Sequence, residues 1–337
     1  MGSEDPACVS HSFGCPGRPK GVELSHRSLV NLLLALQAEP GFGACDVMLG
    51  LSPVSSAAFG CELWLPLIVG ARVAIVPCRT AVDPEVLAKS IEQHGITVMQ
   101  ATPSIWRMLL QSGWTGCDRL RAWSGGETLR SDLAGRLLLL CGEVWNLYGA
   151  TETTAWSMVG RVQSGTPVTL GRPIAGVSVR IVDDLEQPAP VGVPGEIQVT
   201  GAGLALGYWG QPSLTVQKFF ADPDAVGLAN RIHRTGDYAR HTADGRIEFI
   251  GRADARDEIR GFRIDLGEIE VALSRHEGVD QAVVIVREDT PGKRLLVAYV
   301  IPAREAPDGE HLSAFLRGHL PAYMVPVQFV FLKSFPL

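Results

Sequence analysis

Paired cysteines, a metal-binding histidine motif and a long hydrophobic run are all missing from this sequence. Its 7 cysteines are scattered without a C-x-x-C pair, which is typical of reduced thiols rather than of a disulfide framework. Its 8 histidines form neither H-x-H nor H-E-x-x-H, so we expect no structural zinc site. The most apolar stretch, Leu63–Val76, is interrupted by Pro66, Gly70 and Arg72, whereas a membrane span needs about 20 nearly uncharged residues.

A basic tract and a signal peptide are missing as well. The 30 Lys and Arg residues are outnumbered by 36 Asp and Glu residues, and the formal net charge is −6. A mildly acidic chain of this kind is not typical of general nucleic-acid binders. The N-terminus has neither the basic start nor the apolar run of a signal peptide. We therefore expect a cytoplasmic protein with neither a nucleic-acid nor a membrane partner.

The chain does have the composition and the patterning of a globular α/β protein. Its 337 residues are 46% hydrophobic and 20% charged, enough for one large or two ordinary domains. In the first half, apolar strands such as Thr97–Gln100 alternate with helical patterns such as Asp83–His94 and Ser104–Gln111. This alternation predicts a mostly parallel sheet covered by helices. From Thr169 short strands predict a β-rich part, and a compact α+β unit follows near Leu266.

The first segment suited to chemistry is the Gly/Pro-rich loop Gly14–Gly21. Consecutive glycine amides can approach an anion, and Lys20 supplies a positive charge. The spacing is not that of a Walker A loop. Taken alone, the segment is better explained as a Gly/Pro surface loop with one lysine.

A second cluster, Asn146–Thr154, follows a predicted strand and combines an aromatic ring, a glycine turn, hydroxyls and a carboxylate. Ligands of open α/β sheets bind at such strand ends. Tyr148 suits stacking on a base, and Glu152 suits a hard cation such as Mg²⁺. A hydrogen-bonded turn is the alternative explanation.

A third cluster of charged residues begins at Arg234–Asp237 and continues through Gly251–Glu270. Asp237 suits a ribose diol, because a carboxylate accepts hydrogen bonds from hydroxyls. Arg252 suits a phosphate or a ribose. Individually, each of these charges is more readily explained as a solvated surface group.

In this order, the three clusters resemble the adenylation domains of nonribosomal peptide synthetases, which belong to the acyl- and aryl-CoA ligase and luciferase superfamily. In the second cluster, Asn146–Glu152 reads N-L-Y-G-A-T-E, which is similar to the family pattern N-x-Y-G-P-T-E. Further matching blocks extend over nearly the whole chain: Gly195–Tyr208, Arg234–Asp237, Gly251–Glu270 and Leu320–Pro326.

The resemblance implies an α/β fold with two domains, both incomplete. Residues 1–253 would form a large domain that is β-rich from about residue 169, and residues 254–337 would form a small α+β domain. Asp254 would be the hinge between them, and Gly261 would face the incoming thiol. The family continues beyond the block at Leu320–Pro326 to an N-G-K segment, and its large domain also has a part upstream of the phosphate loop. The resemblance therefore implies truncation at both ends.

The activity implied by the resemblance is the ATP- and Mg²⁺-dependent activation of a carboxylic acid. The acid would be an amino acid or a related hydroxy, keto or aryl acid. The acyl-adenylate would pass to the phosphopantetheine thiol of a peptidyl carrier protein within a synthetase. Two alternatives remain: a non-catalytic fragment or scaffold of a synthetase, and an acyl- or aryl-CoA ligase.

The resemblance also assigns residues to roles. Catalysis is assigned to Lys20, Thr151 and Glu152, with Glu152 also binding Mg²⁺. Nucleotide binding is assigned to Gly14, Gly17, Gly125, Gly126, Asn146, Tyr148, Asp237 and Arg252. The substrate pocket is assigned to Ala57, Ala58, Cys61, Gln100, Trp123, Gly125, Leu147, Ala155 and Trp156.

Two departures from the family pattern bear on function. In the phosphate loop, Phe13, Cys15 and Pro16 stand where the family has Ser, Ser and Thr, which removes hydrogen-bond donors. Ala57 stands where the family has an aspartate that pairs with the substrate ammonium. An ammonium buried without a partner is costly. Either the substrate lacks an α-amino group or amino-acid binding is impaired.

Overall fold

A computed structural model describes residues 2–12, 20–222, 231–252, 256–259, 262–290, 293–303, 307–320 and 324–335. The chain divides into two compact units: Met1–Thr235 with Arg240–Phe249, and Gly236–Ala239 with Ile250–Leu337. The predicted hinge residue, Asp254, lies outside the described residues, so the domain boundary at this position stays a prediction. Among the described residues, no helix is both long and apolar enough to cross a membrane.

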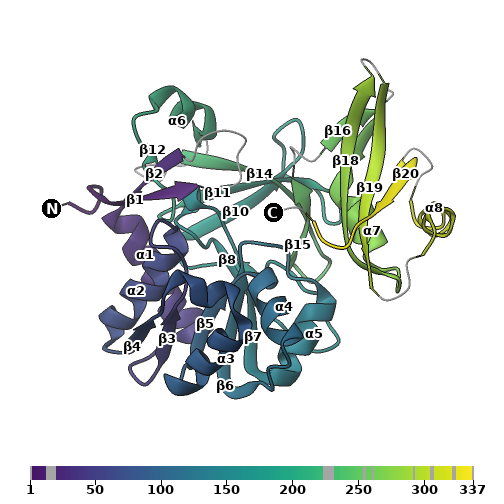
Figure 1. Ribbon diagram of the computed structural model, residues 1–337. Helices are drawn as coiled ribbons and strands as arrows, with labels where there is room; N and C mark the ends of the chain where they lie inside the picture. Colours follow the sequence, from purple (N-terminus) through teal and green to yellow (C-terminus); the bar gives the residue numbers. More distant parts are fainter. Residues whose placement is uncertain are drawn as a thin grey trace. The chain divides into compact units, whose positions relative to one another are not determined.

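The first unit is built on a seven-stranded sheet with the order β4-β3-β5-β6-β7-β8-β9 (Figure 1). Its strands are β3 (Val47–Gly50), β4 (Arg72–Ile75), β5 (Val98–Ala101), β6 (Cys117–Gly125), β7 (Cys141–Tyr148), β8 (Met158–Arg161) and β9 (Arg172–Pro173). Neighbouring strands from β4 to β7 are parallel, while β8 and β9 are added antiparallel. The mixed α/β fold expected from the sequence is confirmed.

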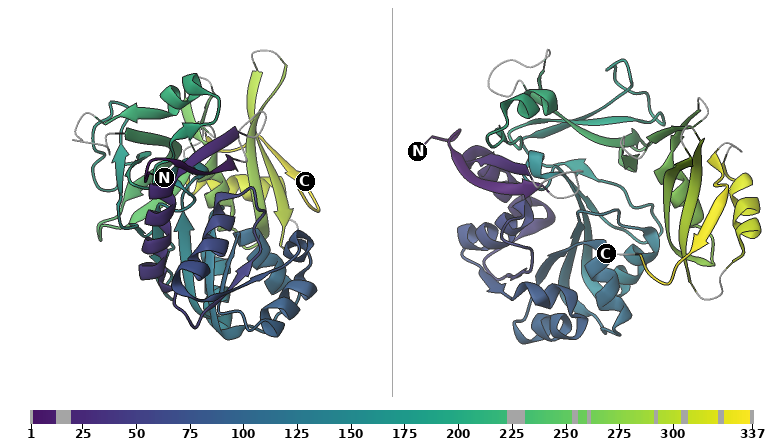
Figure 2. Two further views of the ribbon diagram at one scale, coloured as in Figure 1. Left: turned by 90° about the vertical axis from the view of Figure 1, so that its left-hand side faces the viewer. Right: turned by 45° about the horizontal axis from the view of Figure 1, so that its top comes forward.

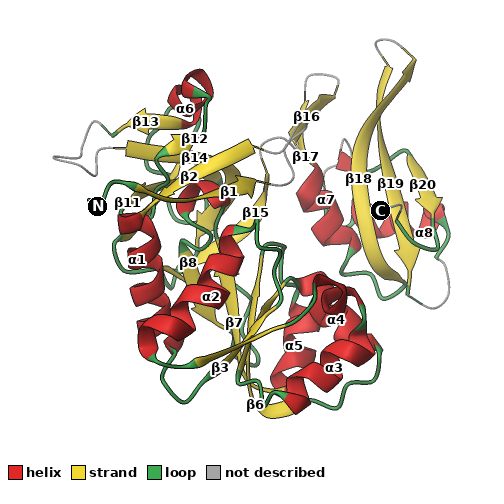
Figure 3. Cartoon of the chain, turned by 60° about the vertical axis from the view of Figure 1, so that its left-hand side comes forward, coloured by secondary structure: helices red, strands yellow, loops and turns green. Residues whose placement is uncertain are grey.

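Helices cover both faces of this sheet. The helices are α1 (His26–Leu36), α2 (Ala57–Val69), α3 (Pro84–Gln93), α4 (Pro103–Gln111) and α5 (Ser131–Leu140). Buried side chains of α3, α4 and α5 form one core with alternate residues of the strands, such as Met99 and Ala101. Gln100 lies between these two residues and turns to the opposite face, where its amide contacts α2. Figure 3 shows α1 beside α2 and, apart from them, the group α3 to α5.

Local sequence explains where the helices begin. The Ser25 hydroxyl accepts a hydrogen bond from Ser28 N (3.1 Å), which caps α1. Asp83 caps α3 by accepting from the amides of Glu85 and Val86, both at 3.1 Å. These are the side chains that satisfy the free N–H groups of a first helical turn. The helix expected over Asp83–His94 is confirmed as α3, with its cap at Asp83.

Two smaller sheets follow, and within the second of them residues 236–239 of β14 and 250–252 of β15 are counted with the second unit. One has the order β1-β2-β12, with β1 (Pro6–Ser12), β2 (Lys20–Ser25) and β12 (Gly207–Tyr208). The other has the order β10-β11-β14-β13, with β15 paired to β14. Its strands are β10 (Val177–Val182), β11 (Gly195–Gly201), β13 (Phe219–Ala221), β14 (Arg231–His241) and β15 (Ile247–Arg252), and α6 (Pro212–Lys218) precedes β13. Single turns of helix are η1 (Gln37–Gly41), η2 (Cys78–Val82) and η3 (Thr151–Thr153).

The second unit has its own sheet and core, coloured yellow-green to yellow in Figure 2. The sheet order is β18-β19-β20, with β18 (Val279–Thr290), β19 (Lys293–Pro302) and β20 (Gln328–Phe331). Helices α7 (Leu266–Leu273) and α8 (Gly309–Arg317) supply Ile269 and Leu312 to this core. Strands β16 (Arg256–Ile259) and β17 (Phe262–Asp265) form a hairpin ahead of α7.

Candidate functional site

The carboxyl ends of β5, β6 and β7 bring together several residues assigned to the substrate pocket. Gln100 pairs in register with Trp123, and Gly125 pairs with Leu147. Because side chains alternate along a strand, residues two apart share one face. Trp123 and Gly125 therefore lie on the face to which Gln100 points, which is the face that α2 covers.

A buried hydrogen-bond network occupies this face. Glu62 of α2 is fully buried, and its carboxylate accepts from the amides of Leu51 and Ser52 (both 2.8 Å) and from the Ser52 hydroxyl (2.5 Å). Gln100 Nε2 donates to Glu62 Oε1 (2.9 Å), and Trp156 Nε1 donates to Gln100 Oε1 (2.7 Å). The network thus connects a buried acid to an aromatic ring assigned to the substrate pocket.

Burial raises the pKa of Glu62 from its ordinary value to about 7, although the hydrogen bonds from Ser52, Leu51 and Gln100 act in the opposite direction. Removing a carboxylate from water penalises its charged form, whereas donors aimed at it favour that form. Burial is the larger of the two effects here. Glu62 is the only acidic residue of α2. Its described hydrogen bonds come from Leu51, Ser52 and Gln100.

Trp156 lies tightly against Gly125. A Cβ atom added to Gly125 would lie 2.5 Å from Trp156 Cη2 and 2.7 Å from Leu147 O, closer than carbon atoms pack in proteins. The chain reaches this position through two non-glycine residues in the left-handed region, Thr154 (φ 57°) and Ala155 (φ 68°). Left-handed backbone in such residues costs about 1–3 kcal/mol each and tends to occur at functional sites.

Two polar groups on β6 are buried without a partner. Trp123 and Ser124 are both fully buried, and in the described part of the chain neither Trp123 Nε1 nor Ser124 Oγ has a hydrogen-bond partner. A donor left unsatisfied in this way typically costs about 1–3 kcal/mol. The indole N–H of Trp123 is therefore suited to a neutral acceptor oxygen on a ligand.

Two of the three residues assigned to catalysis, Lys20 and Glu152, lie around one tyrosine. Tyr208 Oη donates to Glu152 Oε1 (2.7 Å), and Lys20 Nζ lies 5.7 Å from the centroid of the Tyr208 ring. Tyr208 is held opposite Val22 by the pairing of β12 with β2. Ala205 N donates to the Glu152 carbonyl (2.9 Å). Lys20 and Glu152, which are far apart in the sequence, therefore both lie beside Tyr208.

A histidine and a phenylalanine lie behind this tyrosine. Phe219 packs edge-on against Tyr208 at 6.0 Å between ring centroids, and His233 lies 5.0 Å from Phe219. Burial lowers the pKa of His233 to about 4, although Glu152 and the Lys218 carbonyl raise it. His233 is thus neutral at neutral pH and adds no positive charge beside Glu152.

The residues assigned to nucleotide binding are distributed over both units. Asn146 is buried, and its Nδ2 donates to the Thr169 carbonyl (2.8 Å). The Tyr148 ring lies 6.4 Å from that of Phe249. In the second unit, Arg252 Nη1 donates to Asp237 Oδ1 (3.0 Å), so these two residues form an ion pair.

The remaining assigned residues are placed as follows. Ala57, Ala58 and Cys61 lie in the first turns of α2, which is capped by Ser56. Thr151 opens η3, and Gly126 follows β6. Gly14, Gly17, Asp254 and Gly261 lie outside the described residues, as do Phe13, Cys15 and Pro16.

A metal site made by protein ligands alone is not found. In the described ranges, no group of three or more His, Cys, Asp or Glu side chains is arranged to hold a metal ion. Mg²⁺ commonly binds through one or two carboxylates, with water and substrate phosphates completing its shell. The single buried carboxylate of Glu152 fits a Mg²⁺ ion that arrives with a nucleotide.

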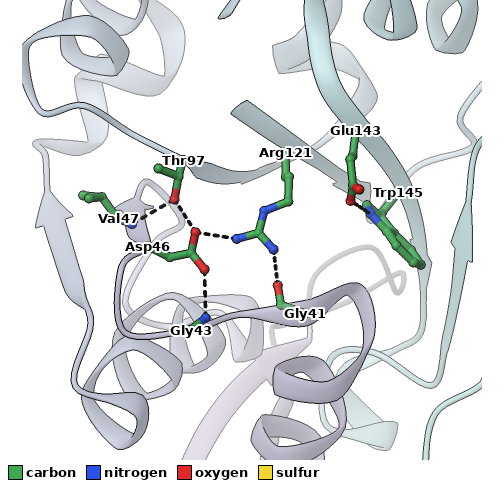
Figure 4. Close-up of polar contacts among 8 residues, drawn as sticks. All are labelled: Gly41, Gly43, Asp46, Val47, Thr97, Arg121, Glu143 and Trp145. Atoms are coloured by element: carbon green, nitrogen blue, oxygen red, sulfur yellow. Dashed lines mark hydrogen bonds and ion pairs between the residues drawn. The ribbon is translucent and has the colours of Figure 1, made fainter. Parts of the chain in front are cut away.

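At the opposite edge of the sheet, near the amino ends of β3 and β5, partly buried polar groups are paired with one another (Figure 4). Arg121 Nη2 lies 2.5 Å from Asp46 Oδ1, and Arg121 also donates to the Gly41 carbonyl. Thr97 Oγ1 donates to Asp46 (2.8 Å), and Gly43 N donates to its second oxygen (2.8 Å). Burial alone would raise the pKa of Asp46, but the hydrogen bonds, first that from Arg121, hold it below its usual range.

Two residues of the candidate site, Glu62 and Tyr208, were not assigned a role from the sequence. Glu62 stands out only as a charged residue in an otherwise apolar helix, a pattern that signals a buried, paired charge. Tyr208 belongs to a recognised block, but its link to Glu152 depends on strand pairing that the sequence does not reveal. Both contact residues that the sequence did single out.

Comparisons with known proteins agree on one family. The family model described as AMP-binding enzyme matches residues 1–209. The model described as AMP-binding enzyme C-terminal domain matches residues 268–337. The chain is 43% identical over 336 residues to a dimodular nonribosomal peptide synthase of Bacillus subtilis (strain 168), covering 99% of this chain and 14% of that protein. The chain thus spans about a seventh of that relative.

Solved structures agree with this result. A crystal structure of a four-domain nonribosomal peptide synthetase bound to AMP and glycine aligns with a TM-score of 0.85 at 38% identity, covering 99% of this chain and 25% of that chain. Klebsiella oxytoca NpsA in complex with 3-hydroxyanthranilyl-AMSN aligns with a TM-score of 0.85 at 28% identity, covering 100% of this chain and 68% of that chain.

Proposed function

Since the chain belongs to the AMP-binding enzyme family, we propose that it activates a carboxylic acid with ATP, forming an acyl-adenylate for a nonribosomal peptide synthetase. In this reaction a carboxylate oxygen attacks the α-phosphorus of ATP, a phosphorus–oxygen bond forms, and the bond to pyrophosphate breaks. The protein contributes mainly by positioning the reactants and by neutralising charge.

The observation that carries this proposal is the convergence of Lys20 and Glu152 on Tyr208. A lysine ammonium suits the phosphate oxygens, and a buried carboxylate suits the cation that accompanies them. Bound Mg²⁺ would supply charge neutralisation on the phosphates, with Glu152 as its protein ligand. Thr151, beside Glu152, would contact the α-phosphate.

The nucleoside would be held by the groups at and beyond the end of β7. Asn146 and Tyr148 would contact the adenine, with Gly125 and Gly126 at the end of the neighbouring strand β6. Asp237 is proposed, separately, as an acceptor for the ribose hydroxyls. Its present partner is Arg252, at 3.0 Å, so this carboxylate is already oriented by a cation.

For the substrate we propose an acid without an α-ammonium group, such as a hydroxy, keto or aryl acid. Two observations support this choice. The only acidic residue of α2 is Glu62, whose carboxylate already accepts four hydrogen bonds from the protein. In the part of the chain that the structure describes, the buried Trp123 N–H lacks an acceptor, and a neutral oxygen on the substrate would satisfy it.

The acceptor of the acyl group is proposed to be the phosphopantetheine thiol of a carrier protein. The support comes from the relatives named above, which are peptide synthetases. A direct comparison of a carrier protein with coenzyme A as the acceptor tests this step separately from adenylation.

Acid-dependent ATP–pyrophosphate exchange tests the proposed function. A panel would pair each α-amino acid with its α-hydroxy and α-keto analogues, and would include aryl acids. We expect exchange that depends on a non-amino acid and that is lost in Glu152→Gln. If no acid in the panel supports exchange, the proposed activity is wrong and a scaffold role is favoured.

A further inference from the structure

We propose that Tyr208 is a positioning residue for the Mg²⁺–nucleotide complex, acting through Glu152. This inference rests on the proposed function, because it deepens the role given there to Glu152. Tyr208 is buried, and its hydroxyl donates to Glu152 Oε1 at 2.7 Å. That hydrogen bond fixes the plane of the carboxylate, so that the other oxygen can serve the cation.

The tyrosine is itself held by several contacts. Tyr208 N donates to Thr215 Oγ1 (2.9 Å), and the ring packs against Phe219. Gly207, the residue before it, has φ 151°, and a Cβ there would lie 2.4 Å from Thr215 Cγ2. Only glycine permits this close approach, so the sequence Gly207–Tyr208 is required for Thr215 to hold the tyrosine.

The same ring also faces the lysine. Lys20 Nζ lies 5.7 Å from the ring centroid, within the range of a cation–π interaction. Trp209 N donates to the Gly21 carbonyl (2.8 Å), which ties this segment to β2 next to Lys20. Tyr208 therefore sets the positions of both groups: its hydroxyl acts on Glu152, and its ring face acts on Lys20.

These two contacts can be removed separately. Tyr208→Phe deletes the hydroxyl but keeps the ring, and Tyr208→Leu deletes both. The matched control is Tyr299→Phe in the second unit, where the lost hydroxyl accepts a hydrogen bond from Arg287 at 3.2 Å. Isothermal titration calorimetry of the full chain with ATP, with and without Mg²⁺ and without any acid, gives the Mg²⁺-dependent gain in affinity.

We expect Tyr208→Phe to reduce the Mg²⁺-dependent gain about tenfold, the size typical of one hydrogen bond to a charged group. Affinity without Mg²⁺ stays within about twofold, because the contact of Lys20 with the ring is kept. Tyr208→Leu also weakens binding without Mg²⁺, by about two- to fivefold. Tyr299→Phe changes neither quantity.

Two further variants keep the inference testable if Tyr208→Phe folds poorly. Thr215→Val removes the partner of the Tyr208 amide at a partly exposed position, and we expect a two- to fivefold smaller Mg²⁺-dependent gain. In a Glu152→Gln background, Thr215→Val should have no further effect on that gain. An equal effect in both backgrounds would show a general structural role and would overturn the inference.

The outcomes separate this inference from the proposed function. If the wild-type chain binds MgATP but shows no acid-dependent exchange, the proposed function fails while the role of Tyr208 is still measured by binding. If exchange occurs and Tyr208→Phe has the wild-type Mg²⁺ dependence, the inference fails alone. A wild-type chain whose ATP affinity does not respond to Mg²⁺ also overturns the inference.

Discussion

Strand β6 carries Arg121 near the amino ends of its neighbours and Ser124 near their carboxyl ends, and the two residues have different surroundings. The guanidinium of Arg121 is paired with Asp46 and Gly41 (Figure 4). The hydroxyl of Ser124 is fully buried and, within the described ranges, has no partner. One edge of the sheet is thus stabilised by its own contacts, whereas the other retains donors for a ligand.

The difference shows how a single sheet serves both stability and binding. Buried polar groups normally find partners within the protein, so an exception needs an explanation. Among the described residues the exceptions are Arg27 Nε, Trp123 Nε1 and Ser124 Oγ. The two on β6, Trp123 and Ser124, lie at the strand ends where ligands of α/β folds bind, and we interpret these two as groups reserved for a ligand.

The largest effect is expected at the amino edge, where Arg121→Met leaves the Asp46 carboxylate without its cation. We expect the free energy of unfolding to fall by about 3–4 kcal/mol, because the charged guanidinium loses its hydrogen bonds to Asp46 and Gly41, and each bond of this kind contributes about 1.5–3 kcal/mol. Arg161→Met is the control: its ion pair with Glu143 (2.8 Å) is exposed and contributes about 0.5 kcal/mol. Urea denaturation measures both, and equal losses would contradict the contrast.

The second effect is a dependence of stability on pH that arises from Glu62. Its pKa is raised from 4.5 to about 7 by burial, so between these values the folded chain binds a proton that the unfolded chain has released. The free energy of unfolding therefore falls as pH rises from about 4.5 to about 7, by roughly 3 kcal/mol, and is level above that.

Glu62→Gln isolates this contribution. The variant lacks the titration, so the stability of the wild type relative to the variant should decline between pH 5 and pH 8, as measured by denaturation at each pH. Glu92→Gln, at an exposed position of α3, should track the wild type throughout. A constant difference between wild type and Glu62→Gln would show that Glu62 does not titrate in this range.

The third effect concerns specificity at the carboxyl edge. Ala57→Asp adds a carboxylate to the first turn of α2, where the family has an aspartate. We expect kcat/KM for exchange with an α-amino acid to rise about 10–100-fold relative to its hydroxy analogue, the range for one charged hydrogen bond. Ala57→Asn has the same shape without the charge and should not produce the shift. A similar shift with asparagine would assign the effect to shape.

The smallest effect compares two hydroxyls on the two edges. Ser124→Ala removes a hydroxyl without a described partner, so we expect stability to rise by up to about 1 kcal/mol. Thr97→Val removes a hydroxyl that donates to Asp46 and accepts from Val47 N (2.9 Å), so we expect a loss of about 1–2 kcal/mol. Differential scanning calorimetry measures both, and a loss at Ser124 would argue against an unsatisfied group.

The architecture was predictable from sequence where local signals were strong. The alternation of strands with helices such as Asp83–His94 and Ser104–Gln111 indicated the parallel sheet correctly. Strand β1 was missed, because Pro6–Ser12 has little apolar patterning and is defined by pairing with β2. The charged stretch Gly251–Glu270 includes β16, Arg256–Ile259, which is likewise defined by pairing with β17.

The residues of the candidate site were also predictable only where a motif marks them. Motifs singled out Lys20 and Glu152, but the residue that connects them, Tyr208, depends on the pairing of β12 with β2. Likewise, Gln100 was assigned to the pocket, whereas its anchor Glu62 is identified only by the packing of α2 on the sheet. Contacts between distant segments of the chain are the part that local pattern does not encode.

The close approach at Gly125 also limits how the substrate preference of this chain can change. A Cβ there would lie 2.5 Å from Trp156 Cη2 and 2.7 Å from the Leu147 carbonyl oxygen. A smaller residue at position 156 would remove the first clash, but the second is with the backbone and would remain. Position 125 is therefore expected to stay glycine during divergence or directed evolution, so that changes in the shape of this pocket would come from position 156.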